Sequence, residues 1–424
     1  MHRFKLRYAL PVSAVLCVAV IGGAAWVDAK GGRPAKVSVP HLNAAPLIAS
    51  TGVSETVSAV VSGTADAVEL VVTDPETGEE TVKPMHRDRN ELWTASIPSS
   101  LIDEGKLIYR VTAAYDEVTK SSSLAELVVL DNLRQSTPTL VDNTGRTMQT
   151  ATLGDGATEL GVRGGKESAA ELPPSFAVDQ EERVHVLDAV KGRVVVLDGP
   201  GVSSTLDLTG VTTTASDVVL GEGGTTFVLD QAKDAIEEIA ANGNRTFRAG
   251  LGVRSMPLGA LLVHMTDSGT TYIREATQGR FVPVLKNRQK VSASDRKSDT
   301  RAGIPTTEGD LAVEVAERTV TYALSEDRIS GYRISFPDQV LDASETVVDD
   351  TGAIWSLVGV YNATNDTASK YLVRIDPDTG VSRMVSVGGS VPGDVTKRLV
   401  NAGRGVALME GEGNTLSFIR FQTI

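Results

Sequence analysis

The sequence predicts an all-β protein in which a membrane-targeting N-terminus precedes a small β-sandwich and a large β-propeller. Three observations support this fold class. The chain opens with a basic stretch followed by a long apolar run. Short alternating strands and turns fill the next part. The rest of the chain repeats an apolar strand, a polar turn and a second strand about every 45 residues, which is the length of a four-stranded propeller blade.

The composition fits a folded protein with more than one core. The chain has 424 residues, of which 41% are hydrophobic and 22% charged, so it is too long for one ordinary domain and too apolar to stay unfolded. Aromatic residues make up 4%, while Val, Thr, Gly and Ala are abundant, as in short strands and turns. The net charge of -13 argues against nucleic-acid binding, which needs a basic surface.

The N-terminus predicts export from the cytoplasm. Residues 1–29 fit either a signal peptide cleaved after Ala29 or an uncleaved anchor helix that spans the membrane, and both alternatives stay open. Either one places the rest of the chain outside the cytoplasm, secreted or membrane-anchored. The single cysteine, Cys17, lies in this segment, so the folded part has no disulfide and no thiolate site. Residues 30–40 are expected to be a linker.

Residues 41–132 are expected to form the β-sandwich. Its clearest strands are 57–61, 68–72, 92–97, 107–113 and 124–130. The stretch around Tyr109 resembles the late strands of Ig and fibronectin type III modules, in which a tyrosine bonds back to the preceding corner. The resemblance implies this role for Tyr109 and a spacer or interaction role for the module. Trp93 is expected in its core.

Residues 133–152 are expected to be a second linker and residues 153–424 to form the propeller. Six copies of the repeat align on one position in the second strand of each copy. The aligned residues are His185, Phe227, Tyr272, Tyr322, Trp355 and Ala407. Six copies predict six blades, and the period is too long for a β-helix.

Two segments carry a family resemblance. The stretches from Phe176 to Asp188 and from Val347 to Trp355 are similar to repeats of NHL-type, TolB-like and related six-bladed propellers. The resemblance covers residues 170–424, implies the fold, and fits a bacterial protein that carries an Ig-like module ahead of its propeller.

The ring of blades is expected to close through strands from both ends of the propeller. Unpaired edge strands promote aggregation, so one blade should combine an early strand with late ones. The last apolar strand runs from Leu416 to Phe421. The segment from Thr158 to Val162 is predicted to supply the outer strand beside it.

The sequence predicts no catalytic residue, no cofactor and no metal site. It contains no His-Glu-x-x-His, no Gly-x-Ser-x-Gly and no phosphate-binding glycine loop. His185 is expected to pack within a blade rather than bind a metal. Ser175, Ser216, Asp217 and Glu314 could face the mouth of the central channel, but four such residues are too few for the metal site of a propeller lactonase.

One basic segment stands out in this acidic protein. Its residues are Lys286, Arg288, Lys290, Arg296, Lys297 and Arg301. They are expected to bind an anionic partner, either a protein or an envelope polymer, although such a segment can also be a solvated loop.

These observations favour a non-catalytic binding or scaffold protein at the cell envelope, which uses propeller loops and the Ig-like module for recognition. Two alternatives stay open. One is a propeller hydrolase that acts on a glycan, lactone or peptide at the central channel. The other is a subunit of an envelope or secretion assembly. An uncleaved N-terminal helix would add the membrane as a partner.

Overall fold

The computed structural model describes residues 41–424 apart from short gaps. The gaps are 43–46, 62–63, 76, 88–91, 103–104, 117, 123, 131, 143–144, 165–170, 200, 213, 222–223, 252–262, 266–268, 275–279, 302, 307–308, 326–329, 389–394 and 396. The predicted targeting segment 1–29 and linker 30–40 lie outside the described residues. Within the described part, no helix is long and apolar enough to cross a membrane. This part is all-β apart from the short helix α1 (Ala293–Ser298) and the 3₁₀ turn η1 (Ser99–Leu101).

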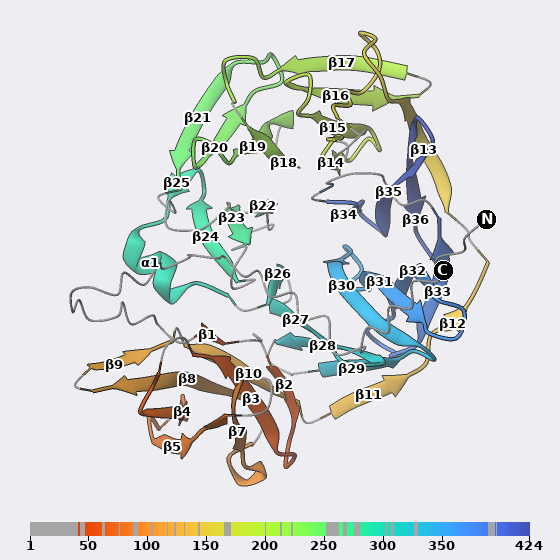
Figure 1. Ribbon diagram of the computed structural model, residues 1–424. Helices are drawn as coiled ribbons and strands as arrows, with labels where there is room; N and C mark the ends of the chain where they lie inside the picture. Colours follow the sequence, from red (N-terminus) through yellow and green to blue (C-terminus); the bar gives the residue numbers. More distant parts are fainter. Residues whose placement is uncertain are drawn as a thin grey trace, which may run out of the picture. The chain divides into compact units, whose positions relative to one another are not determined.

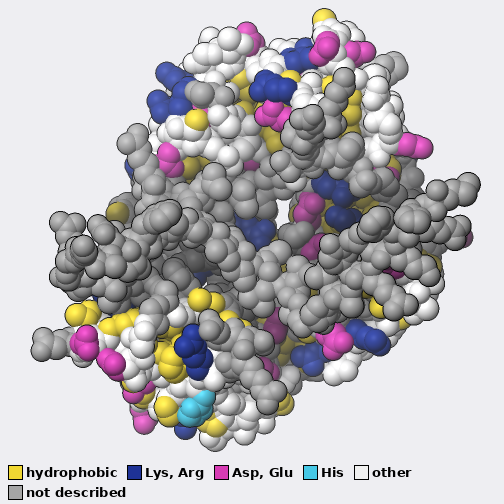
Figure 2. All heavy atoms as spheres, viewed as in Figure 1, with side chains coloured by type: hydrophobic (Ala, Val, Ile, Leu, Met, Phe, Trp, Pro, Cys, Tyr) yellow, Lys and Arg dark blue, Asp and Glu magenta, His cyan; other side chains and the backbone are white. Residues whose placement is uncertain are grey.

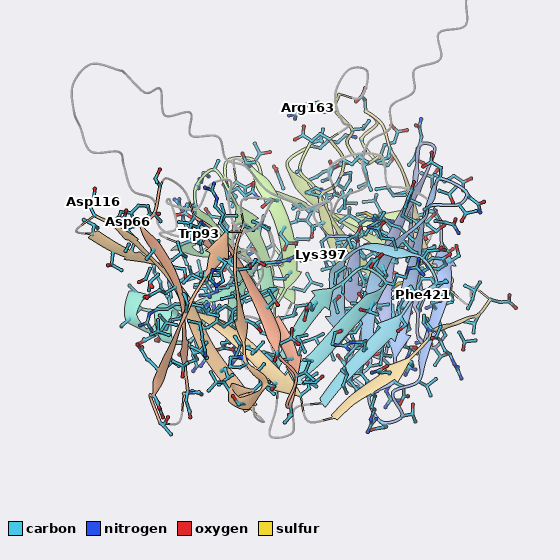
Figure 3. The ribbon with its side chains drawn as sticks, turned by 60° about the horizontal axis from the view of Figure 1, so that its bottom comes forward. Asp66, Trp93, Asp116, Arg163, Lys397 and Phe421 are labelled. Atoms are coloured by element: carbon cyan, nitrogen blue, oxygen red, sulfur yellow. The ribbon has the colours of Figure 1, made fainter. Side chains whose placement is uncertain are left out.

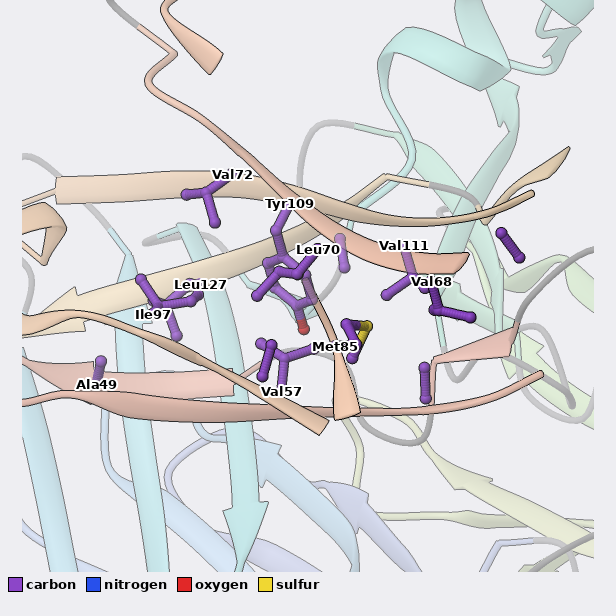
Figure 4. Packing of buried hydrophobic residues seen from close by; sticks show 14 of the residues in the cluster. Ala49, Val57, Val68, Leu70, Val72, Met85, Ile97, Tyr109, Val111 and Leu127 are labelled. Atoms are coloured by element: carbon purple, nitrogen blue, oxygen red, sulfur yellow. The ribbon is translucent and has the colours of Figure 1, made fainter. Parts of the chain in front are cut away.

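Residues 41–130 form two sheets that share one hydrophobic core (Figure 4). The first sheet has the order β1-β3-β7-β6, with β1 (His41–Leu42), β3 (Glu55–Val60), β7 (Trp93–Ile97) and β6 (His86–Arg87). The second has the order β2-β10-β8-β4-β5, with β2 (Leu47–Ser50), β10 (Ala125–Leu130), β8 (Gly105–Tyr115), β4 (Ala67–Thr73) and β5 (Glu80–Pro84), and β9 (Val118–Ser121) pairs with β8.

Alternation of side chains along the strands explains this core. Val68, Leu70 and Val72 lie at every second position of β4 and are all buried, because successive side chains of a strand point to opposite faces. Tyr109 of β8 is fully buried beside Leu70 (Figure 4). Trp93 packs against the same core and is partly exposed. Membership of this module in the Ig class stays a prediction.

Six further sheets of four or five strands follow (Figure 1). Blade 1 contains β14 (Ser175–Val178), β15 (Val184–Asp188), β16 (Arg193–Asp198) and β17 (Gly201–Asp207). Blade 2 contains β18 (Ala215–Leu220), β19 (Thr226–Asp230), β20 (Ala235–Ile239) and β21 (Arg245–Gly250). Blade 3 contains β22 (Val263–Met265), β23 (Thr270–Arg274), β24 (Phe281–Lys286) and β25 (Gln289–Lys290).

The other three sheets each include a strand from early in the chain. Blade 4 contains β26 (Ile304–Thr306), β27 (Gly309–Val315), β28 (Thr319–Ser325), β29 (Ser330–Ser335) and β11 (Asn132–Ser136). Blade 5 contains β30 (Gln339–Val348), β31 (Ile354–Asn362), β32 (Thr367–Ile375), β33 (Ser382–Val387) and β12 (Thr139–Leu140). Blade 6 contains β34 (Leu399–Asn401), β35 (Val406–Glu412), β36 (Thr415–Phe421) and β13 (Arg146–Thr152).

The six sheets are arranged as the blades of a β-propeller. Separate hydrophobic clusters join blades 1 and 2, 2 and 3, 4 and 5, 5 and 6, and 6 and 1. Between blades 3 and 4, the backbones of Phe281 and Arg301 exchange two hydrogen bonds of 2.9 Å, and the Arg301 side chain pairs with Asp310. Every blade therefore contacts the next around the ring, as the repeat in the sequence predicts.

Blade 4 corrects the alignment of the repeats. From the centre outwards its strands are β26, β27, β28, β29 and β11 (Figure 1). Tyr322 lies on β28 and therefore on the third strand, whereas it was expected on the second. The reason is that the innermost strand, β26, has only three residues, Ile304-Pro-Thr306, and gives almost no apolar signal.

A strap of residues 132–152 runs along the outer edges of three blades. Its strand β11 pairs in parallel with β29, β12 pairs in parallel with β33, and β13 pairs antiparallel with β36. The segment 133–152, predicted as a linker, thus belongs to the propeller. The prediction that 158–162 closes the ring is wrong, because the closing strand is β13. Its sequence, Arg-Thr-Met-Gln-Thr-Ala-Thr, lacks an apolar alternation, which an exposed outer strand does not need.

The segment 154–162 instead forms a loop fastened to blade 1. Lys191 Nζ donates to the carbonyl oxygens of Gly156 (2.7 Å) and Glu159 (2.8 Å). Arg193 donates to the carbonyls of Ala157 (2.7 Å) and Glu159 (2.6 Å). Leu160 is buried in the cluster between blades 6 and 1. The loop therefore seals the joint that β13 closes.

Candidate functional site

Three polar side chains meet at the inner strands of blades 1, 2 and 6. Asp217 on β18 is fully buried and accepts hydrogen bonds at one oxygen, Oδ1, from Ser175 Oγ (2.5 Å) and Lys397 Nζ (2.5 Å). The backbone N–H of Val218 donates to the same oxygen at 2.8 Å. We call Ser175, Asp217 and Lys397 the central cluster. It joins the first, second and last blades through one buried carboxylate.

Sequence order explains why these residues meet. Ser175 and Asp217 lie on innermost strands. Lys397, labelled in Figure 3, lies just before the innermost strand of blade 6. These strands come together at the centre because blades 6, 1 and 2 are consecutive in the ring. Figure 2 shows acidic and basic side chains next to one another at the opening in the middle of this face.

A second contact joins blades 5 and 6. Glu345 Oε2 on β30 accepts the backbone N–H groups of Arg398 (2.5 Å) and Leu399 (2.9 Å). Burial raises the pKa of Glu345, and the two N–H bonds oppose this change without cancelling it. The buried Arg398 side chain donates to the carbonyl oxygen of Met409 at 3.4 Å. This carboxylate therefore fixes the start of β34.

The chemistry available to the central cluster is limited by burial. Ser175 is fully buried, and its hydroxyl proton is directed to Asp217. Lys397 directs its ammonium group to the same carboxylate. A nucleophile or base must reach a substrate atom. Among the described residues, no group of three or more His, Cys, Asp or Glu side chains gathers to hold a metal ion. The arrangement of the central cluster is suited to holding neighbouring blades together.

The four residues expected at the channel mouth take different positions. Ser175 and Asp217 meet in the central cluster. Ser216 donates to the carbonyl oxygen of Leu229 within its own blade at 3.5 Å. Glu314 lies on β27, the second strand of blade 4, where its carboxylate accepts the backbone N–H of Ile48 at 3.0 Å. Burial raises the pKa of Glu314, and the Ile48 bond opposes this.

Sequence reasoning missed Lys397, Arg398 and Glu345. The adjacent Lys397 and Arg398 stand immediately before the apolar strand β34, at the position where a blade starts. Glu345 interrupts a strand of mainly apolar and small residues. The sequence signal that could have identified these three residues is a charged residue at the start of an innermost strand or within it.

In blades 1 and 5, an aspartate in the turn after the first strand contacts the residue at the aligned position of the repeat. Asp179 accepts the backbone N–H of Arg183 (2.8 Å) and lies 2.9 Å from His185 Nε2. Asp349 accepts the backbone N–H of Ala353 (3.1 Å) and the indole N–H of Trp355 (2.8 Å). In both blades, an aspartate directly follows the first strand and pairs with a ring six residues later. Donors of the turn and of the ring therefore satisfy both carboxylates, and for Asp179 these donors include the Arg183 side chain.

Hydrogen bonds and burial have opposite effects on the pKa of Asp179. Burial raises its pKa, but the hydrogen bonds from His185 and from the backbone and side chain of Arg183 outweigh this effect. Its pKa is therefore lower than usual. His185 packs in blade 1, where it was expected.

The six basic residues do not form one open loop. Arg288 pairs with the buried Glu238 (2.7 Å), and Arg301 pairs with Asp310 (2.7 Å) and lies over the ring of Tyr272. Arg296 donates to backbone carbonyl oxygens of Leu251 and Val291. Lys286 and Lys290 are exposed, and Lys297 lies in α1, with its side chain outside the description. Their role in partner binding stays a prediction.

A groove lies beside two of these basic residues. Its volume is about 320 Å³. It is lined by Leu251, Lys290, Val291, Ser292, Ala293 and Arg296. Apolar walls and two cationic side chains therefore face the same space.

No protein-family model matches the chain, and no curated protein matches it. Several solved structures are similar to part of the chain. Virginiamycin B lyase from Staphylococcus aureus is 9% identical, with 59% of this chain and 94% of that chain covered and a TM-score of 0.35. A gluconolactonase from Xanthomonas campestris is 15% identical, with 58% and 84% covered and a TM-score of 0.32.

The extracellular domain of a bacterial protein, from B. thetaiotaomicron, is 9% identical, with 86% of this chain and 54% of that chain covered and a TM-score of 0.35. All three TM-scores lie below 0.5. The propeller fold of this chain is therefore assigned from its own strand order and blade contacts.

Proposed function

We propose that the protein is a non-catalytic binding or scaffold protein of the bacterial cell envelope, located outside the cytoplasm. In this proposal residues 1–29 direct export or anchor the chain, and an Ig-like module and an NHL- or TolB-like propeller of six blades recognise a protein partner. The basic start and apolar run of the sequence support the location.

One observation carries the non-catalytic assignment. The inner acidic residues Asp217 and Glu345 are each used by a neighbouring blade, through Lys397 and Ser175 in one case and through backbone N–H groups in the other. A propeller hydrolase would need an acid, base or nucleophile that a substrate can reach. Buried contacts of this kind make the ring rigid, and a rigid ring presents its loops to a partner.

A pull-down with the full chain tests the proposal. The tagged protein is incubated with detergent-solubilised membranes of the source organism, and we expect one partner to be retained in stoichiometric amount. Retention of no partner at physiological salt contradicts the binding role.

A turnover assay tests the non-catalytic part separately. A panel of lactones, glycans and peptides is incubated with the wild type and with Ser175→Ala and Ser216→Ala. We expect no turnover by any of the three proteins. Turnover that is lost in Ser175→Ala and kept in Ser216→Ala would show that the central cluster is a hydrolase site.

A further inference from the structure

We propose that the groove beside α1 binds an acidic segment of the protein partner, with a carboxylate on Lys290 and Arg296 and an apolar neighbour against Val291 and Ala293. This inference rests on the proposed binding function and names the site and the chemistry of its ligand. The groove lies where the end of β21, the edge strand β25 and α1 meet, on blades 2 and 3 (Figure 1).

The charge of Arg296 is the first argument. Arg288 and Arg301 face the carboxylates of Glu238 and Asp310, whereas Arg296 directs its guanidinium to the backbone carbonyl oxygens of Leu251 and Val291. Burial lowers the pKa of Arg296, and the negative charge of Asp234 opposes this. A cation that is partly desolvated and bonded to carbonyl dipoles gains from an incoming carboxylate.

The second argument is the position of Lys290. Its side chain is exposed at the end of β25 and lines the same groove. Two cations therefore face one space in a chain whose net charge is -13. Charge complementarity consequently favours an acidic ligand at this place.

The walls select between classes of anionic ligand. Val291 is half-buried and Ala293 is exposed, and both line the groove, so part of it offers apolar contact. A volume of about 320 Å³ is at the lower end for ligand pockets and suits one or two side chains. Polyanionic polymers bind through many cations and gain little from apolar walls. The groove therefore favours a peptide in which an acidic residue adjoins an apolar one.

The experiment measures binding of a defined peptide to the full chain by fluorescence anisotropy. The probe is a fluorescein-labelled peptide of alternating Glu and Leu, and the control peptide has Lys in place of each Glu. We expect the acidic peptide to bind the wild type and Lys290→Glu to weaken binding at least tenfold. Arg404→Glu is the matched control, since it makes the same change in charge at an exposed residue of blade 6; it should leave binding unchanged.

Three outcomes overturn the proposal. They are absence of acidic-peptide binding, equal weakening by Lys290→Glu and Arg404→Glu, and stronger binding of inorganic polyphosphate than of the peptide. The pull-down separates this proposal from the function it rests on. A partner retained equally by the wild type and Lys290→Glu leaves the binding function standing and removes the groove as its site.

Discussion

At the scale of single residues, buried carboxylates join parts of the chain that lie far apart in the sequence. Asp188 on β15 is fully buried and accepts the backbone N–H of Gly161 (3.1 Å) and Arg193 Nε (2.9 Å). Arg193 also donates to two carbonyl oxygens of the loop 154–162. One arginine thus neutralises a buried charge and fastens the loop that covers the closing joint.

Removal of the Arg193 side chain should therefore strongly destabilise the folded protein. We expect Arg193→Met to lower the free energy of unfolding by about 3–5 kcal/mol, because it leaves the buried Asp188 without its counter-ion. The measurement is urea unfolding followed by circular dichroism. Arg163→Met is the matched control, since Arg163 and its partner Glu171 have side chains that are 65% and 54% exposed. Its expected loss is below about 1 kcal/mol. Equal losses for the two variants would contradict this assignment.

Glu237 on β20 is a buried carboxylate that is less stable when it carries its charge. It is fully buried, and burial raises its pKa although Arg248 and Arg245 oppose this. The folded protein then binds this proton more tightly than the unfolded chain. Its contribution to stability is therefore present at low pH and is lost as the pH rises from the usual value of 4.5 through the raised pKa.

Glu237→Gln should consequently raise the melting temperature by a few degrees at pH 8 and change it much less near pH 4. Glutamine resembles the protonated acid and has no charge to bury. Calorimetry of both proteins across this pH range is the measurement. Glu80→Gln is the control, because the hydrogen bond from Arg110 lowers the pKa of the exposed Glu80, and its loss should reduce stability slightly. A lower melting temperature for Glu237→Gln at pH 8 would contradict the stated sign.

At the scale of elements, β13 is the strand that closes the ring. The backbone N–H of Leu153 donates to the carbonyl of Asn414 at 2.8 Å. In an antiparallel pair, N–H groups two residues apart point the same way, so the N–H of Ala151 also faces β36, opposite Leu416. The N–H of Thr150 faces away from β36.

Two adjacent proline substitutions test this ladder. We expect Ala151→Pro to lower the free energy of unfolding by about 2–4 kcal/mol, because proline has no N–H to donate to β36. Thr150→Pro should have a much smaller effect, since proline is tolerated where the N–H faces outwards from an edge strand. Urea unfolding measures both. A loss for Thr150→Pro as large as that for Ala151→Pro would remove the proposed role of the ladder.

The same element shows what the sequence could and could not reveal. Buried strands such as Val184–Asp188 and Thr226–Asp230 were predicted close to their bounds because apolar residues fill them. β13 and β26 were missed, the first because an exposed outer strand can be polar and the second because it has only three residues. The order of strands in a sheet also sets which strands pair when they lie far apart in the chain. A local sequence pattern carries no information about such pairing.

The candidate sites were harder to predict than the strands, for a related reason. Asp217 and Ser175 could be named from the sequence because they adjoin apolar strands. Lys397 could not, because its meeting with Asp217 depends on ring closure, which brings the last blade beside the first two. Likewise, the excess of basic residues in this segment could be seen in the sequence. Their ion pairs with Glu238 and Asp310 could not, because these pairs depend on contacts between blades.

At the scale of the whole molecule, the contacts between blades make the ring one cooperative unit. Blades of a closed ring have two neighbours, so the failure of one joint exposes apolar surface on both sides. We expect Ala151→Pro to lower hydrogen-exchange protection in β19 and β20 of blade 2 as well as in blades 6 and 1. Mass spectrometry of exchanged peptides is the measurement. Loss confined to blades 6 and 1 would show that the ring frays locally, as a solenoid does.

The pairing of β13 with β36 also bears on how the protein is made. Arg146 leaves the ribosome long before its partner Arg420 is synthesised, so the early strand must wait for the late one. A chain whose synthesis stops before Thr415 would hold β13 and β35 without the strand that lies between them. Such a nascent chain offers open strand edges that pair with other chains. The ring can therefore form only after β36 has been synthesised.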